Sequence, residues 1–480
     1  MIVILQCSVE EGEIMITFQD FQKETDIPKF IAFAINNHIK SDEYKIAQMA
    51  DKYNKQQNIT IYEYVRTIFT LLGGTVEDYT SSNNKVASNF FHKLNTQRCN
   101  YSLGNGVSFS NHNVETISAD GIKVMTDQTK EMLGQRFDTD LKTVAYNALI
   151  HRVCFGYWNW DRLYCFPLTE FVPFWDEDTS ALRAGIRFWR LASDKPMIAV
   201  LYEEDGYTKY KSNSNGFIFE EVEPKRAYKT IVKSTEAGGE QVIGEQNYGS
   251  LPIVPLWGNK IHQSTLIGMR SAIDAFDLIK SGFANDIIDC AQVYWIISGA
   301  AGMSDAELER FRDRLKLNHI AAADTENSAI TPYSQEVPYQ SRKEILDEIR
   351  SGIYEDFGAL DVHTIAAGAT NDHIDAAYQS MDDEADDFEF QIIEFIQQIL
   401  SLMEIEDVPI FKRNKISNQK EQTDMVLSAA DYLDDETILN KLPFISVDEV
   451  YHILAKKDKE DFNTFSDSNK DDENDYEENE

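Results

Sequence analysis

Five acidic side chains crowd into one short stretch of this 480-residue chain. They are Asp382, Asp383, Glu384, Asp386 and Asp387. Carboxylate oxygens are the ligands that Mg²⁺ and Ca²⁺ prefer, so the row could serve a metal-dependent nuclease. Adjacent residues of a helix point in different directions, which works against a shared metal ion. We therefore favour a solvated face of a long helix and predict no metal and no cofactor, with the nuclease as the alternative.

Two histidines lie on either side of a stretch rich in glycine and alanine. His363 is near Asp361, and His373 is next to Asp372, so a His–Asp pair acting as a general base is conceivable. No nucleophile in a recognisable setting accompanies either pair. The small residues Ala366–Ala369 suit a loop that shifts or packs closely, rather than a rigid catalytic turn. We predict a polar loop here and no catalytic residue.

Three further patterns restrict the chemistry. The chain lacks the Gly-Lys dipeptide of a phosphate-binding loop, so any nucleotide-driven step belongs to another protein. Trp158 and Trp160, with Phe174–Trp175, could stack on bases or sugars, but we favour core aromatics of a β-rich region. Basic side chains recur on one short helix, where a solvated face competes with a docking surface for a partner or for phosphate. These are Arg310, Arg312, Arg314 and Lys316.

The composition excludes several classes of protein. With 42% hydrophobic residues, the 480 positions can form about two to four domains with real cores. The net charge of −36 argues against a conventional DNA-binding protein, which would show a basic face. The five cysteines form no CxxC pair, so neither a disulfide framework nor a zinc site is indicated and a reducing cytosol fits. The first residues do not resemble a signal peptide, and no run approaches the roughly 18 apolar residues of a membrane span.

The first half of the chain mixes helices with a β-rich region. Helical spacing predicts helices at residues 27–38, 41–55, 82–106 and 141–155. Ser41 is the expected N-cap of the second helix. Apolar runs between turn signals predict strands at 156–161, 163–168, 184–192, 197–203 and 206–210. Two prolines within 251–256 favour an edge strand there.

The second half is a set of long helices around a small insert. Capping boxes at Ser304–Glu307 and Ser341–Glu344 open an insert helix and a returning helix that runs to 357. Strands predicted at 319–323 and 329–333 make the insert a small α/β module. The longest helix is expected at 374–403. The residues expected to pack the helices on either side of the insert are Leu266, Met269, Ile273, Phe276, Phe283, Ile345, Ile349 and Ile353.

The C-terminal region is predicted to be built from short elements. A strand is expected at 408–411, followed by small helices at 424–431, 435–441 and 447–456. Residues 458–480 are mostly Asp, Glu, Asn and Ser, which cannot bury enough apolar area to order themselves.

Taken in order, several segments resemble the portal (connector) proteins of tailed bacteriophages, in the branch typical of long-tailed phages of Gram-positive hosts. Asn100-Tyr-Ser-Leu-Gly104 is similar to the Asn-Tyr-Leu-x-Gly ending of the family's early helix, and Leu251-Pro-Ile-Val-Pro255 resembles the link into its first stem helix. The other similar segments are 84–91, 148–160, 166–176 and 273–286. Their order, with the plan of helix, insert, helix, loop and long helix, extends the resemblance over residues 27–455.

The resemblance implies an α+β, mainly helical subunit with several domains, which assembles into a ring that usually has twelve copies. Its implied parts are a wing (1–263), a first stem helix (264–294), a clip (295–340), a second stem helix (341–358), a tunnel loop (359–371), a long helix (372–403), a wing return strand (404–423), a crown (424–457) and an acidic tail (458–480). The residues implied to face DNA in the tunnel are His363, Thr364, Ile365, Ala366, Ala367, Gly368, Ala369, Thr370 and Asn371.

The implied function is that of a virion component at the portal vertex, assembled in the host cytoplasm, without enzymatic activity. Double-stranded DNA would pass through the channel during packaging and ejection. The clip, with its basic residues, would dock the terminase large subunit and later the head–tail adaptor, and the ring would contact the major capsid or scaffolding protein but no membrane. DNA carries about one negative charge per 1.7 Å, so a tunnel lined with acids would repel it evenly and let it slide. A different structural protein of the virion is a further alternative.

Overall fold

The computed structural model describes most of the chain. The described residues are 16–69, 74–79, 81–109, 113–117, 123–213, 218–234, 240–290, 294–298, 304, 306–307, 309–310, 329–333, 339–362, 371–415, 419–442, 445, 450 and 453–454. The chain divides into two compact units, the first made of 1–55, 91–269 and 354–480 and the second of 56–90 and 270–353. None of the described helices is long and apolar enough to cross a membrane.

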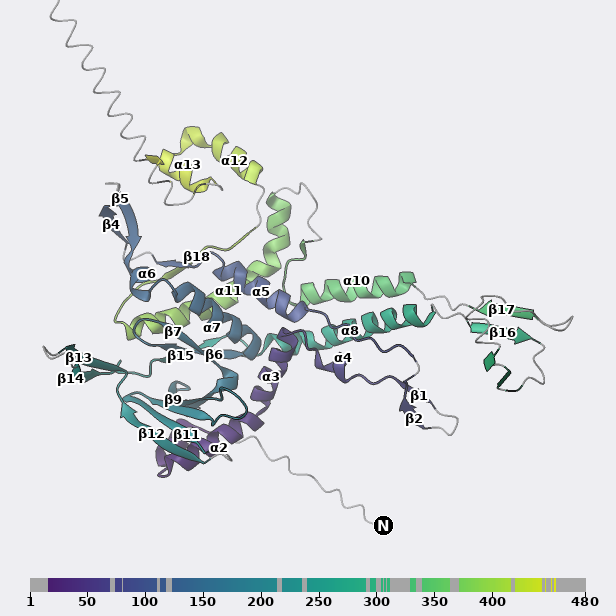
Figure 1. Cartoon of the computed structure of the whole chain (residues 1–480). Coiled ribbons are helices and arrows are strands. Elements are labelled where there is room, and N and C mark those ends of the chain that lie inside the picture. The colour runs from purple at the N-terminus through teal and green to yellow at the C-terminus, as the bar shows by residue number, and fades with distance from the viewer. Residues whose placement is uncertain are drawn as a thin grey trace, which may run out of the picture. The chain divides into compact units, whose positions relative to one another are not determined.

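Two antiparallel sheets form the framework of the first unit (Figure 1). Their strands are β6 (Val153–Trp158), β7 (Leu163–Pro167), β8 (Phe171–Trp175), β9 (Leu182–Trp189), β10 (Ile198–Glu203), β11 (Gly206–Ser212), β12 (Phe219–Arg226) and β15 (Ile253–Trp257). One sheet has the order β12-β11-β10-β9-β8 and the other β15-β6-β7. β15 lies at an edge, as predicted, because Pro255 lacks the N–H that a central strand needs.

Helices and short hairpins complete this unit. The helices are α1 (Phe18–Lys23), α2 (Ile27–Lys40), α3 (Asp42–Asn54), α5 (Phe90–Leu103), α6 (Gln128–Leu133), α7 (Phe137–His151), η1 (Leu168–Glu170), α11 (Asn371–Leu402), α12 (Gln419–Ser428), η3 (Ala430–Tyr432) and α13 (Asp435–Lys441). The hairpins pair β4 (Asn113–Ile117) with β5 (Lys123–Asp127) and β13 (Lys229–Ser234) with β14 (Glu240–Gln246), while β3 (Val107–Phe109) pairs with β18 (Pro409–Phe411). Ser41 caps α3 as predicted, its hydroxyl accepting the backbone N–H of Tyr44.

The alternation of side chains along β6 gives the three-stranded sheet two buried faces. Cys154 and Trp158 join a cluster with residues of α7 and α11. Phe155 and Tyr157 join another cluster, which includes residues of the five-stranded sheet. That sheet buries Ile186 on its other face among residues of α1 and α2. The unit is therefore layered as helices, sheet, sheet and helices.

The long helix α11 carries the apolar stripe that its sequence predicts. Its helix begins at Asn371, three residues before the expected start. The predicted positions from 374 to 399 are all buried, namely Ile374, Tyr378, Met381, Ala385, Phe388, Ile392, Phe395 and Ile399. Because the spacing of three or four residues keeps one face inward, its C-terminal half packs on the three-stranded sheet and α7.

The second unit is built around parts of two long helices. Its elements are α4 (Ile59–Glu63), β1 (Thr67–Phe69), β2 (Thr75–Glu77), most of α8 (Thr265–Cys290), β16 (Tyr294–Ser298), β17 (Ala329–Tyr333) and most of α10 (Tyr339–Asp356). α8 and α10 lie side by side (Figure 1), joined by an ion pair of 2.5 Å between Asp286 and Arg342. β17 matches a predicted strand and pairs with β16, which the sequence analysis missed, whereas the strand predicted at 319–323 lies outside the described residues.

An extended segment, residues 82–88, lies against α8 through what we call the α8 ladder. Four side chains of α8 accept backbone N–H groups from alternate residues of this segment. The pairs are Ser88 to Asp277 (2.8 Å), Val86 to Ser281 (2.9 Å), Asn84 to Asn285 (2.7 Å) and Ser82 to Asp289 (3.0 Å). Four helical residues rise about 6 Å and two extended residues about 6.6 Å, so the two periods nearly match.

The α8 ladder corrects the helix predicted at 82–106. The helix α5 starts only at Phe90. The backbone N–H groups before Phe90 bond to side chains of α8, whereas in a helix they would bond to carbonyl oxygens four residues earlier. The apolar spacing of Val86, Phe90 and Leu94 suggested one continuous helix. The sequence analysis placed residues 56–90 in the wing, 1–263, and did not predict that they group with residues 270–353.

The α8 ladder predicts that Ser281→Ala destabilises the protein by about 1 kcal/mol, because the N–H of Val86 loses its acceptor. Ser271 is an exposed serine on the same helix. Ser271→Ala therefore controls for the change in helix propensity and should stay within about 0.5 kcal/mol. Chemical denaturation of the purified variants measures both changes. Equal stabilities of the two variants would contradict a stabilising role for the ladder.

Candidate functional site

One face of α5 contacts the chain on both sides of residues 363–370. The side chains of this face are Lys93, Gln97, Arg98 and Tyr101, whose spacing places them together on a helix. Lys93 donates to the hydroxyl of Tyr354 at 2.6 Å, and Gln97 donates to the carbonyl of Leu360 at 3.0 Å. These two bonds fix the end of α10 and the residues that follow it.

Arg98 connects the chain before residues 363–370 with the chain after them. Its side chain is 8% exposed and donates to the carbonyl oxygen of Phe357. The guanidinium lies 4.1 Å from the centre of the Phe357 ring, a favourable cation–π distance. It also forms an ion pair of 3.0 Å with Glu384 of α11. A buried guanidinium needs such partners, so Arg98 holds both ends in place.

Gly358 allows the chain that follows α10 to lie close to α11. Its φ of +64° is a left-handed conformation, and its N–H donates to the carbonyl of Glu355 at 3.0 Å to end the helix. A Cβ at this position would lie 2.7 Å from Cγ of Glu384. Only glycine meets both conditions, one of backbone conformation and one of space.

Arg413 binds three of the acids of α11. Its guanidinium donates two bonds to the carboxylate of Glu389, at 3.0 and 2.9 Å, and one to Asp382 at 2.9 Å. A further bond reaches Asp386. The planar fork of arginine suits such bidentate contacts. Arg413 follows β18, whose pairing with β3 brings the residues after it back along α11.

Asp382 is the centre of this network, which we call the α11 clamp (Arg98, Tyr101, Arg413, Lys415 and the acids they contact). Its carboxylate also accepts from the hydroxyl of Tyr101 at 2.5 Å and from Lys415 at 2.7 Å. Partial burial alone would raise the pKa of Asp382, but the bonds from Lys415, Tyr101 and Arg413 outweigh it and lower that pKa. The pKa of the Tyr101 phenol is raised, first by burial and then by Asp382. Asp382 is thus held as an anion.

The clamp changes the interpretation of the acidic row. Asp383 accepts from Gln379 at 3.0 Å, and Asp387 accepts from the backbone N–H of Lys260 at 3.0 Å. Within the described part of the chain, no three His, Cys, Asp or Glu side chains are grouped to hold a metal ion. The row therefore stabilises the fold by ion pairs and hydrogen bonds, and a nuclease site finds no support in its geometry.

The predicted site residues have different outcomes. Residues 363–370 lie outside the described part of the chain, as do Arg312, Arg314 and Lys316, while Asn371 is the first residue of α11 and Arg310 is exposed. Of the predicted packing residues, five are buried: Leu266, Met269, Ile273, Phe276 and Ile353. Phe283 and Ile349 are half-buried, and Ile345 is 45% exposed. Ser304 and Glu307 form their expected contact, with the carboxylate accepting the backbone N–H of Ser304 at 2.8 Å.

The aromatic groups belong to the core or its margin, as favoured above. Trp158 and Phe174 are 0% exposed, and the ring of Trp160 stacks on Tyr248 at 4.3 Å. Trp175 stacks on Trp257 at 5.8 Å. These rings contact the protein itself, so a role in stacking on bases has no support.

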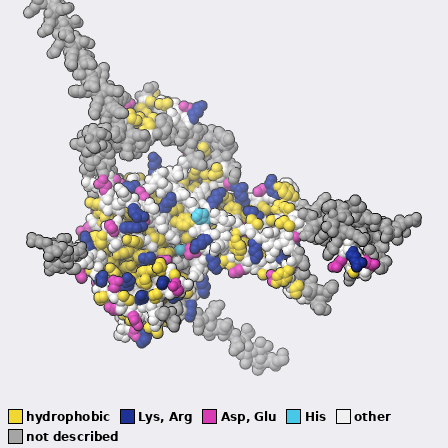
Figure 2. Space-filling view, viewed as in Figure 1, with side chains coloured by type: hydrophobic (Ala, Val, Ile, Leu, Met, Phe, Trp, Pro, Cys, Tyr) yellow, Lys and Arg dark blue, Asp and Glu magenta, His cyan; other side chains and the backbone are white. Residues whose placement is uncertain are grey.

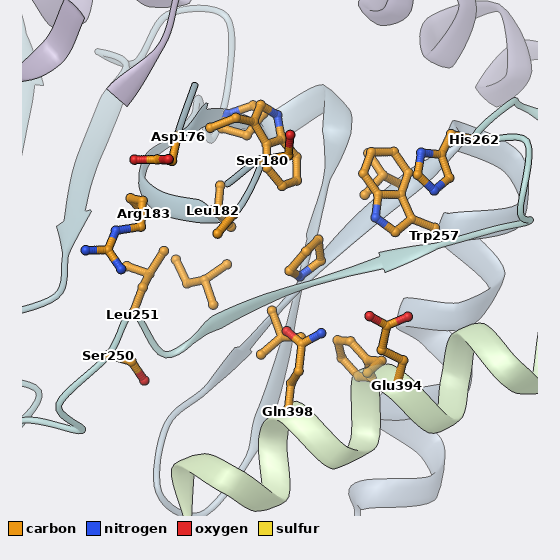
Figure 3. A pocket seen from close by; sticks show the side chains of 18 of the residues that line it. Asp176, Ser180, Leu182, Arg183, Ser250, Leu251, Trp257, His262, Glu394 and Gln398 are labelled. Atoms are coloured by element: carbon orange, nitrogen blue, oxygen red, sulfur yellow. The ribbon is translucent and has the colours of Figure 1, made fainter. Parts of the chain in front are cut away.

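A groove of about 940 Å³ crosses the first unit near these rings. Figure 3 shows it between the turn that follows β8, the strand β15 and the helix α11. Trp257 stacks on His262 at 3.8 Å at one end, and Arg183 pairs with Glu204 at 3.0 Å at the other. The aromatic and ionic groups at its two ends are therefore already paired within the protein.

Sequence reasoning missed Arg98, Arg413 and Lys415, the cations of the clamp. Arg98 lies in an unremarkable helix, and the two others follow a short strand about 30 residues after the acids that they bind. No spacing rule links groups so far apart. The row of acids was the only feature of the sequence that could have pointed to this network.

Comparisons with known proteins agree with one another. A family model described as phage portal protein, SPP1 Gp6-like, matches residues 33–462. The portal protein of Clostridium phage phiCD119 is 24% identical over 245 residues, which cover 47% of this chain and 54% of that protein. The portal protein of Bacillus phage SPP1 is 24% identical over 339 residues, covering 66% and 61%. The chain thus spans between half and two thirds of the length of these curated relatives.

The α11 clamp predicts that Arg413→Ala lowers the free energy of unfolding by about 1–3 kcal/mol at pH 7. The pKa of Asp382 is lowered in the folded protein, so its contribution is present above about pH 4 and is lost as pH falls through the folded value. The difference between wild type and variant should therefore shrink in acid. Denaturation between pH 7 and pH 3 measures it, and a difference independent of pH would contradict the clamp. Lys412→Ala, at an exposed neighbour, is the control.

Proposed function

The chain belongs to the SPP1 Gp6-like family of phage portal proteins, and we propose that it assembles into a ring at one vertex of the capsid, through which double-stranded DNA enters and leaves. The observation that carries this proposal is the family match over residues 33–462, which includes both compact units. The role is structural, and the ring has no catalytic step of its own.

In this proposal the two units have different tasks. The first, with its layered sheets, forms most of the wing, and the helices α12 and α13 form the crown. The parts of α8 and α10 in the second unit form the stem, and residues 295–340 form the clip. The clip would dock the terminase large subunit during packaging and a head–tail adaptor afterwards, with Arg310, Arg312, Arg314 and Lys316 as the basic contact. The capsid or scaffolding protein would meet the wing.

Residues 363–371 would form the tunnel loop, and the α11 clamp supports this assignment. The chain on each side of the loop is fixed through Arg98, which binds Phe357 before it and Glu384 after it. A loop that meets a moving, highly charged polymer needs such a rigid base. Arg98, Arg413 and Lys415 bind Asp382, Glu384 and Asp386, and Asp383 and Asp387 accept hydrogen bonds from Gln379 and Lys260. We therefore assign contact with DNA to the loop and not to the acidic row.

Contacts between copies would use apolar side chains that one chain leaves exposed. Those on α8 and α10 are Ile267, Ile287, Ile288, Tyr339 and Ile345, each at least 43% exposed. Figure 2 shows hydrophobic side chains on the visible surface of this helix pair. A ring closes through heterologous contacts, in which one patch of each copy meets a different patch of the next. Exposed apolar side chains on stem helices fit that requirement.

We predict that Ile345→Asp leaves the single chain folded but prevents ring formation, because Ile345 is exposed within the chain and would be buried between copies. Negative-stain electron microscopy and light scattering should show rings of about twelve copies for the wild type. Lys343→Gln changes the charge of the same helix by the same amount and should form rings. Ile273→Asp, at a fully buried position, should instead unfold the chain. Normal rings from Ile345→Asp would overturn this assignment of the stem surface.

Deleting Ala366–Ala369 should leave rings intact and impair DNA packaging or retention, because the shortened loop would no longer reach the DNA. The clamp lies outside the deletion, so thermal stability should stay close to that of the wild type. Packaged DNA can be measured by nuclease protection in particles that carry the variant. Failure of the deleted chain to assemble would show that the loop is structural and would contradict its assignment as the contact with DNA.

A further inference from the structure

Two cysteines meet across the β6–β7 hairpin. The sulfur atoms of Cys154 and Cys165 are 3.3 Å apart. Cys165 lies opposite Gly156 in the ladder, and Cys154 lies opposite Pro167. Because side chains alternate along a strand, the two thiols point to the same face of the sheet. The pair is therefore a diagonal neighbour pair across two hydrogen-bonded strands.

The two thiols differ in exposure and in partners. Cys154 is 0% exposed, and its thiol donates to the carbonyl of Phe166 at 3.5 Å. Burial raises the pKa of Cys154 above its usual range. Cys165 is partly exposed, and its sulfur accepts from the side-chain amide of Asn147 at 3.5 Å. The accessible, amide-bonded sulfur of Cys165 is the one that a reagent in solution meets first.

We propose that Cys154 and Cys165 form an intramolecular disulfide when the folded protein meets a small disulfide such as oxidised glutathione. The thiolate of Cys165 attacks one sulfur of the reagent, which forms a mixed disulfide and releases one glutathione thiolate. The sulfur of Cys154 then gives up its proton, attacks the sulfur of Cys165 and releases the second glutathione. Two thiols are oxidised, one small disulfide is reduced, and the two protons end on the two glutathione molecules.

The geometry permits the second step with little movement. A disulfide bond is about 2.05 Å long, so the sulfurs must approach by a little over 1 Å from their distance of 3.3 Å. Rotation of the two side chains and the twist of the hairpin can supply this approach. Cys99 offers a contrast among the described cysteines, since its sulfur bonds to the carbonyl of Lys142 at 3.7 Å and has no thiol beside it.

The conditions under which this oxidation would occur follow from the proposed function, on which this part of the inference rests. A virion protein is made in a reducing cytoplasm and then persists outside the cell, where disulfides are stable. The bond would join two neighbouring strands of the three-stranded sheet, which lies under α7 and α11. It would therefore stabilise the wing only after release of the particle.

The test treats the purified full-length protein with oxidised glutathione and then removes the reagent. The protein is next unfolded in guanidinium chloride at neutral pH with excess maleimide, which reacts with the thiolates and blocks the remaining cysteines. Mass spectrometry of the digested protein should find the peptides of Cys154 and Cys165 joined and two hydrogen atoms lighter, while Cys99 carries the maleimide. The oxidised protein should also unfold at a higher temperature than the reduced one. Maleimide on both cysteines would overturn the proposal, as would glutathione left on Cys165 in the wild type.

A matched pair of variants tests the order of the steps. In Cys154→Ser, Cys165 should retain glutathione as a stable mixed disulfide, because the resolving thiol is gone. In Cys165→Ser, Cys154 should remain unmodified, because it is buried. Glutathione on Cys154 in the second variant would contradict the proposed order. These readouts need no ring, so a failure of the disulfide is distinguishable from a failure of the portal assignment.

Discussion

Charge compensation along α11 is the constraint on which the arrangement of the first unit depends. One face of this 32-residue helix is buried, and much of the rest is acidic. Like charges at such spacing repel one another and would destabilise the helix. Arg413 and Lys415, which follow β18, and Arg98, which belongs to α5, supply the opposite charge. To deliver them, β18 must pair with β3 and α5 must lie across the start of α11.

This compensation also fixes the described chain on both sides of residues 363–370. Residues 363–370 begin and end at a base in which Arg98, Gly358 and Glu384 are in contact. A base with so little free space holds the described chain on both sides of these residues in one arrangement. Asp382, Glu384, Asp386 and Glu389 stabilise this base, because their oxygens are bonded to cations.

In the second unit, the groups that need partners are backbone N–H groups instead of carboxylates. An extended segment leaves its N–H groups without partners unless a sheet or a side chain supplies acceptors. The α8 ladder supplies four, at a spacing that only a helix beside an extended strand can match. The polar side chains that accept these bonds interrupt the apolar surface of α8, and Ile287 and Ile288 of the same helix stay exposed. One helix can thus bind the extended segment and still expose apolar side chains.

Local patterns in the sequence determined most of the elements. The stripe from Ile374 to Ile399, the cap at Ser41 and the proline edge at 251–256 all predicted their structures, because period, capping and a missing N–H act over a few residues. Only the tertiary structure decided the partners of Asp382, the extended state of 82–88 and the meeting of Cys154 with Cys165. Each depends on groups brought together by other elements of the fold. Charge pairing, backbone satisfaction and thiol proximity act through space, and sequence spacing carries no record of them.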